Sequence, residues 1–401
     1  MERIRRRSPG VEMKGRTIDG PSPPSVFVGR YGYPKITVGP LAPPIPIPLP
    51  ERLESQSRLY EMDMESVYSL RSSLFRGRHK LNVKMAKETG NPGSEPLVDV
   101  EGHLYPRERK ILDSVKGVAI SSGSMDLEMT SERDLSGLAD ISTSDSITMP
   151  MGPSIDLSKV RIIDNAKVER VVERIVDDTD VKATTAAMEL YGSGISTAHL
   201  VRLMSVGMLG EGKRRKLVPT RWAITAMDDA LSGDLIERSR DFTPLDHYKL
   251  YRGSRFGNHF LVALYPPPYR YEMLEQWKSG SLWGGGRILH DSEGPRGRKG
   301  YASEITGAYY AARLSVLEHL HGLRRSAGAT VVRWITEDYW APLGVWVIRE
   351  TVRRALQEKA ETFHDMSSMR ARIDELSGIR GWEKRSRYLS GPLDTRLEDF
   401  I

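Results

Sequence analysis

The chain contains no cysteine in its 401 residues. This absence excludes disulfide bonds, zinc sites built from thiolates and a cysteine nucleophile. An apolar run of about 18 residues, which a transmembrane helix requires, is also missing. The basic start of the chain is not followed by an apolar stretch, so we expect no secretory signal peptide. Together these absences predict a cytoplasmic protein without a membrane contact.

What is present supports a folded protein with a modest basic excess. Hydrophobic residues make up 39% of the chain, which is enough for a sizeable core, and the length suggests two or three domains. The 59 Lys and Arg against 53 Asp and Glu give a net charge of +6. This excess permits contact with nucleic acid without requiring it. Basic clusters at 5–7, 213–216 and 296–299 favour a surface that faces phosphate.

Changes in composition divide the chain into four parts. The basic, proline-containing residues 1–24 are expected to be disordered. An N-terminal domain should cover 25–157 and include a connector with six prolines between positions 40 and 50. A C-terminal α+β domain should cover 158–387. Residues 388–401 should form a flexible tail.

The periodicity of apolar residues predicts both helices and strands. Strands are expected at 25–39 as a pair, and at 159–163, 247–252, 259–265 and 329–335. Helices are expected at 165–177, 180–191, 196–206, 219–238, 301–325, 343–360 and 365–380. Ser196 is a suitable N-cap for the third of these helices. The fold class is therefore α+β, with mixed sheet elements and a helix-rich C-terminal half.

Glycines, arginines and aromatic residues are concentrated between 278 and 300, which we expect to be a long functional loop. Such a loop can bring backbone amides and guanidinium groups to a phosphate. It is neither a Walker loop nor a dinucleotide fingerprint, and an inert structural loop is the alternative. The candidate contacts to nucleic acid or phosphate are Arg30, Arg221, Arg287, Arg296, Arg298 and Lys299.

Three further side chains are candidates for chemistry. Asp228 and Asp229 could hold Mg²⁺ or Mn²⁺ through carboxylate oxygens, as a nuclease requires. Adjacent residues on a helix point about 100° apart, so one of the two should face solvent, and a plain surface charge is the alternative. His259 could act as an acid or base, or be a polar turn residue. No histidine spacing typical of a zinc site is present, so Mg²⁺ or Mn²⁺ at these two carboxylates is the one cofactor considered.

The last eight residues place three apolar side chains on one face of a helical turn. The spacing resembles the peptide with which replication and repair proteins dock on the sliding clamp, PCNA. That motif has Gln at its first position and two aromatic residues at its end, so the first and last positions of this tail depart from it. The alternative is a tail that folds back on its own domain. The residues concerned are Asp394, Thr395, Arg396, Leu397, Glu398, Asp399, Phe400 and Ile401.

Longer blocks of sequence resemble the archaeal Nre family of DNA repair proteins. They lie at 26–34, 217–229, 257–260, 305–313 and 339–346, and include Pro-Thr-Arg-Trp and Trp-Ala-Pro-Leu-Gly-Val-Trp. Family members often carry an N-terminal zinc element made of cysteines, which this chain lacks. They also carry a C-terminal clamp-binding peptide. The resemblance implies a role in DNA damage repair together with the clamp, and it implies no catalytic residue.

Three hypotheses about function follow. The first is a DNA repair factor that docks on PCNA through its tail, with DNA as a second partner. The second is a metal-dependent nuclease or another enzyme that acts on DNA. The third is a nucleic-acid-binding module without catalysis. The sequence is compatible with both an enzyme and a protein without catalysis.

Overall fold

A computed structural model describes residues 15–88, 106–136, 145–164 and 166–390. The chain divides into two compact units, unit 1 (Met1–Met227) and unit 2 (Asp228–Ile401). The division falls within helix α9 (Thr220–Arg238). The composition had suggested a boundary at 157/158, but that position lies within strand β6 (Ser154–Ile162), which pairs with strands of unit 1 on both of its sides.

Unit 1 is built on a six-stranded sheet in which β4 and β6 run parallel and the other neighbouring strands run antiparallel. Its order is β1 (Thr17–Ser22), β5 (Met125–Ser131), β6, β4 (Phe75–Asn82), β3 (Lys35–Ala42) and β2 (Val26–Val28). The β2–β3 pair confirms the strands predicted at 25–39. Strand β1 lies in the segment predicted as disordered; the buried Ile18 and the pairing with β5 order it.

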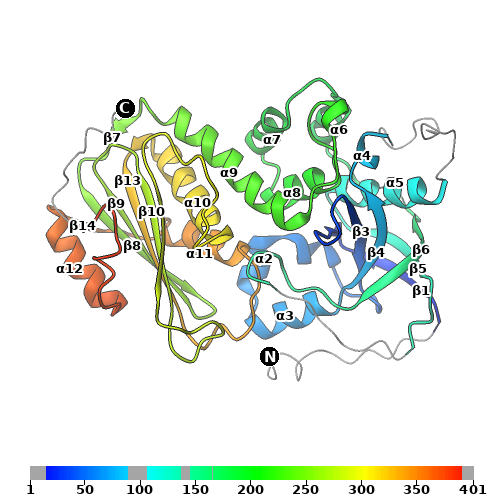
Figure 1. The fold of residues 1–401 in the computed structure, drawn as a ribbon, viewed down its shortest axis with the longest axis horizontal. Coiled ribbons are helices and arrows are strands. Elements are labelled where there is room, and N and C mark those ends of the chain that lie inside the picture. Colours follow the sequence, from blue (N-terminus) through cyan, green and yellow to red (C-terminus); the bar gives the residue numbers. More distant parts are fainter. Residues whose placement is uncertain (1–14, 89–105, 137–144, 165, 391–401) are drawn as a thin grey trace. The chain divides into compact units, whose positions relative to one another are not determined.

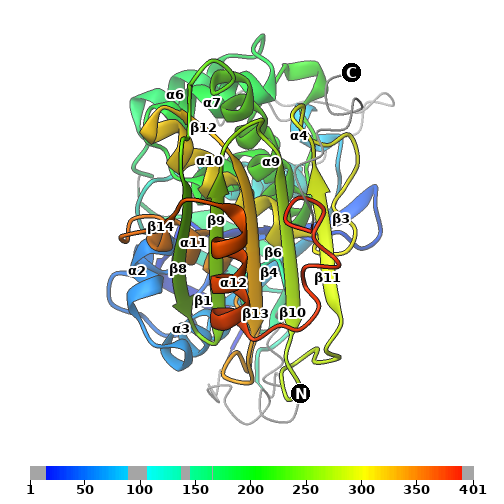
Figure 2. The same ribbon diagram turned by 90° about the vertical axis from the view of Figure 1, so that its left-hand side faces the viewer.

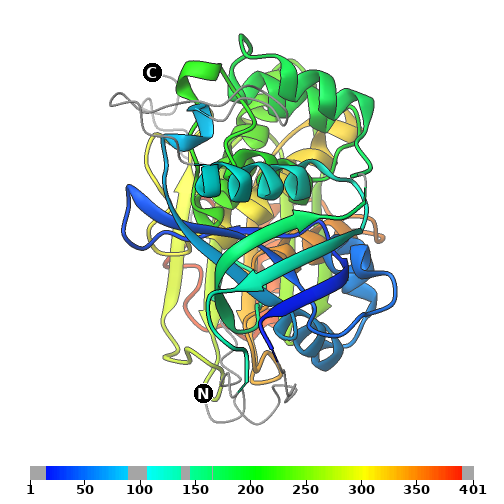
Figure 3. The ribbon, with the colours of Figure 1, turned by 90° about the vertical axis from the view of Figure 1, so that its right-hand side faces the viewer.

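Helices cover the sheet of unit 1, and in Figure 3 the cyan helix α5 (Pro106–Ile120) lies beside its strands. Helix α5 packs against β6 and β3, and the Ser114 hydroxyl donates to the carbonyl of Val160 at 3.1 Å. The Ser196 hydroxyl accepts from the amide of His199, which confirms the predicted N-cap of α8. The other elements are η1 (Pro50–Glu54), α2 (Gln56–Glu61), α3 (Met64–Ser72), α4 (Met85–Glu88), α5 (Pro106–Ile120), α6 (Arg170–Asp177), α7 (Ala183–Gly192), α8 (Thr197–Ser205) and η2 (Gly212–Arg214).

Unit 2 is built on a second six-stranded sheet with helices on both faces (Figures 1 and 2). Its central strands β9 (Asn258–Tyr265) and β13 (Gly328–Ile335) are almost entirely buried, which is typical of strands covered on both faces. The strand order is β11 (Ile288–Glu293), β10 (Tyr271–Trp277), β13 (Gly328–Ile335), β9 (Asn258–Tyr265), β8 (Tyr248–Arg255) and β14 (Glu361–Phe363).

Helices α10 (Gly307–Leu323) and α11 (Trp346–Ala355) pack together on one face of this sheet, and α12 (Met366–Ser377) covers the other (Figure 2). The core beneath α12 includes Trp334, Met369 and Trp382. It also includes Tyr388 and Leu389, so the first residues of the predicted flexible tail pack inside unit 2. A short parallel pair, β7 (Thr243–Pro244) with β12 (Arg325–Ser326), completes the unit.

The α+β class is confirmed, whereas a helix-rich C-terminal half is not clearly supported because the second sheet occupies much of it. Strands β10 and β11 were not predicted, and β11 lies in the segment expected to be a loop. Both strands carry charged or polar residues, which hide the apolar pattern of a buried strand. None of the helices in the described ranges has the length and apolarity needed to cross a bilayer.

Candidate nucleic-acid interface

Two sequence blocks that lie far apart in the chain meet in unit 1. The β2–β3 hairpin carries Arg30, Tyr31 and Tyr33 in its turn, and Trp222 lies in the first turn of α9. The amide of Val28 donates to the Thr220 hydroxyl at 2.9 Å, which fixes the start of α9 beside the hairpin. The rings of Tyr33 and Trp222 then lie 5.7 Å apart, tilted by 45°.

The side chains at this junction form a surface that we call the aromatic–basic patch, made of Arg30, Tyr31, Tyr33, Lys35 and Trp222. Tyr31 is 80% exposed, Tyr33 52% and Trp222 47%. The Arg30 guanidinium lies 5.1 Å from the centre of the Tyr31 ring, and Lys35 is exposed. Exposed rings next to cations are the combination that binds single-stranded nucleic acid, because bases stack on the rings while cations hold the phosphates.

Arg221, another predicted phosphate contact, precedes Trp222 in the chain. Its guanidinium forms an ion pair with Asp145 at 3.0 Å, and about a quarter of its side chain remains exposed. The structure therefore brings two of the six predicted cations, Arg30 and Arg221, onto neighbouring segments of one unit. The aromatic residues beside them were not predicted as contacts.

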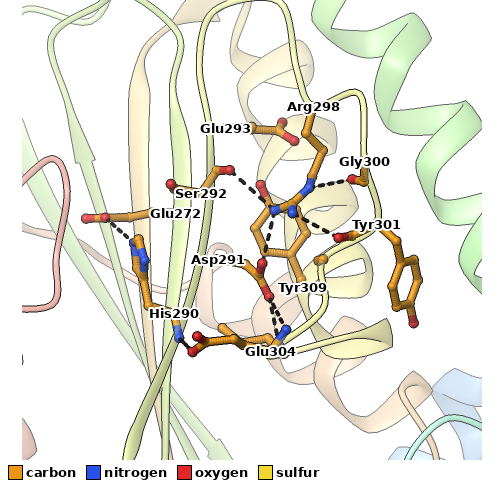
Figure 4. Close-up of polar contacts among 12 residues, drawn as sticks. Glu272, His290, Asp291, Ser292, Glu293, Arg298, Gly300, Tyr301, Glu304 and Tyr309 are labelled. Atoms are coloured by element: carbon orange, nitrogen blue, oxygen red, sulfur yellow. Dashed lines mark hydrogen bonds and ion pairs between the residues drawn. The ribbon is translucent and has the colours of Figure 1, made fainter.

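Arg298 is fixed within unit 2 by its surroundings (Figure 4). Its guanidinium pairs with Asp291 at 3.2 Å and donates to the carbonyls of Ser292, Gly300 and Tyr301 at 3.3, 2.7 and 3.0 Å. Asp291 in turn accepts from the amides of Glu304 and Ile305. These contacts tie β11 to the segment before α10, and they favour a structural role for Arg298. Its contact with nucleic acid stays a prediction.

The remaining predicted cations are exposed in unit 2. Arg296 and Lys299 lie in the loop after β11 and face solvent. Arg287 precedes β11 and pairs with Glu304 at 3.3 Å, with 71% of its side chain exposed. All three are placed where a phosphate could reach them.

Asp228 and Asp229 diverge as adjacent helical residues should. Asp228 is buried and accepts a hydrogen bond from Arg349 at 2.7 Å. Burial raises the pKa of Asp228, and the Arg349 charge opposes this shift. Asp229 is 55% exposed and pairs with Arg313. Each carboxylate therefore neutralises an arginine, and no group of three or more potential metal ligands occurs in the parts of unit 1 and unit 2 that are described.

His259 stacks on Trp334 with ring centres 5.2 Å apart and planes within 10°. Burial lowers the pKa of His259, and the nearby charge of Arg252 lowers it further. The stacking fixes the ring on the sheet, and the lowered pKa favours its neutral form. An acid or base role for His259 stays a prediction.

The structure also reveals a buried charge network that the sequence did not suggest. Glu272 on β10 is fully buried and accepts from Thr330 at 2.9 Å and from the amide of Arg387 at 2.7 Å. The His290 ring lies 3.0 Å from the same carboxylate (Figure 4). Such a carboxylate in a buried strand requires several partners. The signal in the sequence that could have revealed this network is a charged residue, Glu272, within the otherwise largely apolar segment of β10.

A second buried charge cluster surrounds Glu293 at the end of β11. Arg313 donates to Glu293 at 2.6 Å, and Tyr269 donates to it at 2.7 Å. Burial and the charge of Glu293 raise the pKa of Tyr269 well above its ordinary value, so the hydroxyl keeps the proton that it donates. Arg313 lies on α10, whose other buried residues are mostly apolar.

The predicted clamp-binding peptide, 394–401, lies outside the described residues.

Comparison with known proteins provides independent information about the chain as a whole. No solved structure matches it. Residues 1–284 match the family described as "Archaeal Nre, N-terminal", and residues 293–400 match "Archaeal Nre, C-terminal".

Similar proteins extend over nearly the whole chain. "DNA repair protein NreA" of Archaeoglobus fulgidus is 37% identical over 88% of this chain and 83% of the relative. "DNA repair protein NreB" of the same organism is 33% identical over 96% and 92%. "DNA repair protein NreA" of Haloferax volcanii is 32% identical over 97% and 90%. These matches confirm the resemblance seen in the sequence blocks, and the chain belongs to the archaeal Nre family.

Proposed function

We propose that this protein is a DNA repair factor that docks on the sliding clamp PCNA through residues 394–401 and contacts DNA through the aromatic–basic patch. The repair role is supported by the similar proteins, each of which is named a DNA repair protein. The docking is supported by one observation, the spacing of Leu397, Phe400 and Ile401 at the C-terminal end of the sequence.

This spacing suits insertion into an apolar pocket on a partner. Leu397 and Phe400 are three positions apart, so a single helical turn places them on one side with Ile401. A few buried anchors of this kind provide most of the affinity of a peptide interface. The departures from the clamp motif have a physical cost. Asp394 lacks the amide donor of Gln, and Ile401 offers less apolar area than an aromatic ring.

Docking through a tail would keep the rest of the protein close to DNA that the clamp encircles. Tethering raises the effective concentration of a weak second contact without any further interface. The aromatic–basic patch is suited to be that second contact, because Arg30 and Lys35 can pair with phosphates while Tyr31, Tyr33 and Trp222 offer stacking surfaces. The patch alone would bind weakly and would depend on salt.

Deletion of residues 394–401 tests the docking. Titration of purified archaeal PCNA into the full chain should release or absorb heat at one site per chain, whereas the shortened chain should give none. Circular dichroism should show the same folded content for both chains. Equal clamp affinity of the two proteins would reject the docking.

A further inference from the structure

Unit 2 contains a cavity of about 390 Å³. It lies between the end of α9, the β7–β12 pair, the loop after β9 and the loop after β11. Its volume is within the range of small-molecule sites. Its apolar lining includes Phe242, Tyr269, Leu317 and Leu320.

The interior of the cavity is apolar and held in shape. Leu317 and Leu320, from the buried face of α10, are each about 1% exposed. Two aromatic rings line the cavity, and both are fixed by their neighbours. The Phe242 ring lies 5.5 Å from the His321 ring, and the Tyr269 hydroxyl is held by Glu293 at 2.7 Å. Flat, rigid walls of this kind suit a planar aromatic group.

The rim of the cavity is basic. Arg240, Arg296 and Arg325 line it and are all exposed. Arg240 also forms an ion pair with Glu237 at 2.8 Å. No acidic side chain occurs among the described residues that line the cavity. Guanidinium groups bind phosphate with paired, charge-assisted hydrogen bonds, so this rim favours an anionic group next to the apolar interior.

One buried hydroxyl in the wall of the cavity has no hydrogen-bond partner among the described residues. The hydroxyl of Ser239, a residue only 8% exposed, makes no hydrogen bond with any described residue. Buried hydroxyls are nearly always paired in folded proteins. This hydroxyl has almost no accessible surface, so a bound ligand can pair with it only when the Ser239 side chain rotates toward the cavity.

We propose that this cavity binds one nucleotide, with the base between the apolar walls and the 5′-phosphate at the arginine rim. The apolar interior matches the base of such a ligand, and the basic rim matches its phosphate. The bound nucleotide can be free in solution, or it can be an extrahelical nucleotide that has left the stack of a DNA duplex. Binding of an extrahelical nucleotide rests on the proposed repair function, whereas binding of a free nucleotide does not.

Calorimetry on the full chain tests the site with 2′-deoxyadenosine 5′-monophosphate. Binding should have one-to-one stoichiometry, and it should be tighter than binding of either deoxyadenosine or 2′-deoxyribose 5-phosphate, because each of these lacks one half of the ligand. Absence of binding by the nucleotide, or equal affinity for inorganic phosphate alone, would overturn the proposal.

Two substitutions separate the contributions of rim and wall. Arg296→Glu should weaken binding of the nucleotide by roughly tenfold or more, since it removes a charge-assisted hydrogen bond, and should change deoxyadenosine binding much less. Phe242→Leu keeps an apolar side chain and removes the ring, so it should weaken both. Arg380→Glu is the matched control, since Arg380 is exposed in unit 2 and does not line the cavity. Equal effects of Arg296→Glu and Arg380→Glu would contradict the assignment.

The two sources are distinguished with duplexes of equal length. If the ligand is an extrahelical nucleotide, a duplex with one unpaired adenine should bind more tightly than the fully paired duplex. Arg296→Glu should then remove this difference in affinity. If the free nucleotide binds and the duplexes show no difference, the source is the free form. Clamp binding is measured separately on the same variants and should be unchanged, so failure of the cavity proposal and failure of clamp docking can be told apart.

Discussion

Arg349 on α11 neutralises Asp228 in the interior of unit 2, with its terminal nitrogen 2.7 Å from the carboxylate. Both side chains are at most about 3% exposed. The next carboxylate along α9, Asp229, is 55% exposed. Two adjacent acidic residues thus have different surroundings, and this difference predicts different losses of stability when each is replaced.

Asp228→Asn should destabilise unit 2 strongly, by about 3–5 kcal/mol, because the buried Arg349 charge loses its carboxylate. Asp229→Asn should cost less than about 1 kcal/mol, since Asp229 is exposed and Arg313 keeps its buried partner Glu293. Urea unfolding of the two variants measures both values. Equal losses for the two variants would contradict this assignment. A metal-dependent nuclease activity that Asp229→Asn removes without unfolding the protein would instead support catalysis.

His199 should make the protein sensitive to acid. Burial, together with the charge of Arg202, lowers the pKa of His199 to about 3, and its ring lies 3.1 Å from the carbonyl of Ile120. The unfolded chain takes up a proton near pH 6.5 whereas the folded chain does not, so stability is present above that pH and is lost as the pH falls. Between pH 7 and pH 5 this one group should remove about 2 kcal/mol.

The His199→Gln variant isolates this contribution, because glutamine can still donate to the same carbonyl. Its free energy of unfolding should fall less than that of the unmodified protein between pH 7 and pH 5. His364→Gln is the control, since His364 is exposed. Identical pH profiles for the unmodified protein and His199→Gln would show that the imidazole titrates normally in the folded state.

The hairpin between β8 and β9 turns on Phe256 and Gly257, whose φ angles are 51° and 71°. Positive φ at both positions is typical of the tight turn that matches the twist of a hairpin. A Cβ at Gly257 would lie 2.7 Å from the amide nitrogen of Tyr339. Gly257→Ala should therefore lower the free energy of unfolding by more than about 1 kcal/mol.

Gly322→Ala is the control, since Gly322 lies in helix α10 with open space around it. This substitution should be neutral or should raise the free energy of unfolding by up to about 1 kcal/mol. Thermal unfolding compares the two, and a Gly257→Ala protein as stable as Gly322→Ala would refute the proposed strain.

The aromatic–basic patch predicts stacking with single-stranded DNA. Trp222→Ala should weaken binding of a short oligonucleotide by about 1–3 kcal/mol, the usual contribution of one stacked base. Arg30→Ala should weaken it and also reduce the dependence of affinity on salt by about 0.7 in the logarithmic slope, as expected for one lost phosphate contact. Fluorescence anisotropy at several salt concentrations measures both.

Trp283 provides the control for the patch. It is 50% exposed, close to the value for Trp222, but it packs against Trp277 in unit 2. Trp283→Ala should leave oligonucleotide binding unchanged. Equal losses for Trp283→Ala and Trp222→Ala would mean that binding is not localised at the patch.

The sequence predicted those elements whose signals are local. The strand pair at 25–39, the cap at Ser196 and the strand at 329–335 follow from turn residues, a capping hydroxyl and an apolar run. Strands β10 and β11 could not be predicted in this way, because Glu272 in β10 and Asp291 in β11 interrupt the apolar pattern. Their partners, including Arg298 and Thr330, lie on other elements.

The candidate interface was predicted in part, for the same reason. Arg30 and Arg221 could be chosen by residue type and by the glycines or proline near them. The contact between Tyr33 and Trp222 depends on the packing of α9 against the β2–β3 hairpin, which no local pattern encodes. The cavity of unit 2 is likewise assembled from four segments that are separate in the sequence. Among its lining residues, only Arg296 was predicted from the sequence as a phosphate contact.

Attachment to the clamp is the central claim, and a titration of the terminal peptide measures it most directly. A synthetic peptide with the sequence of residues 394–401 should bind purified archaeal PCNA and compete with the full chain for the same site. The same peptide with Leu397→Ala and Phe400→Ala should lose most of this affinity, because the buried anchors dominate such interfaces. Equal binding by the two peptides, or binding by neither, would contradict the proposed attachment.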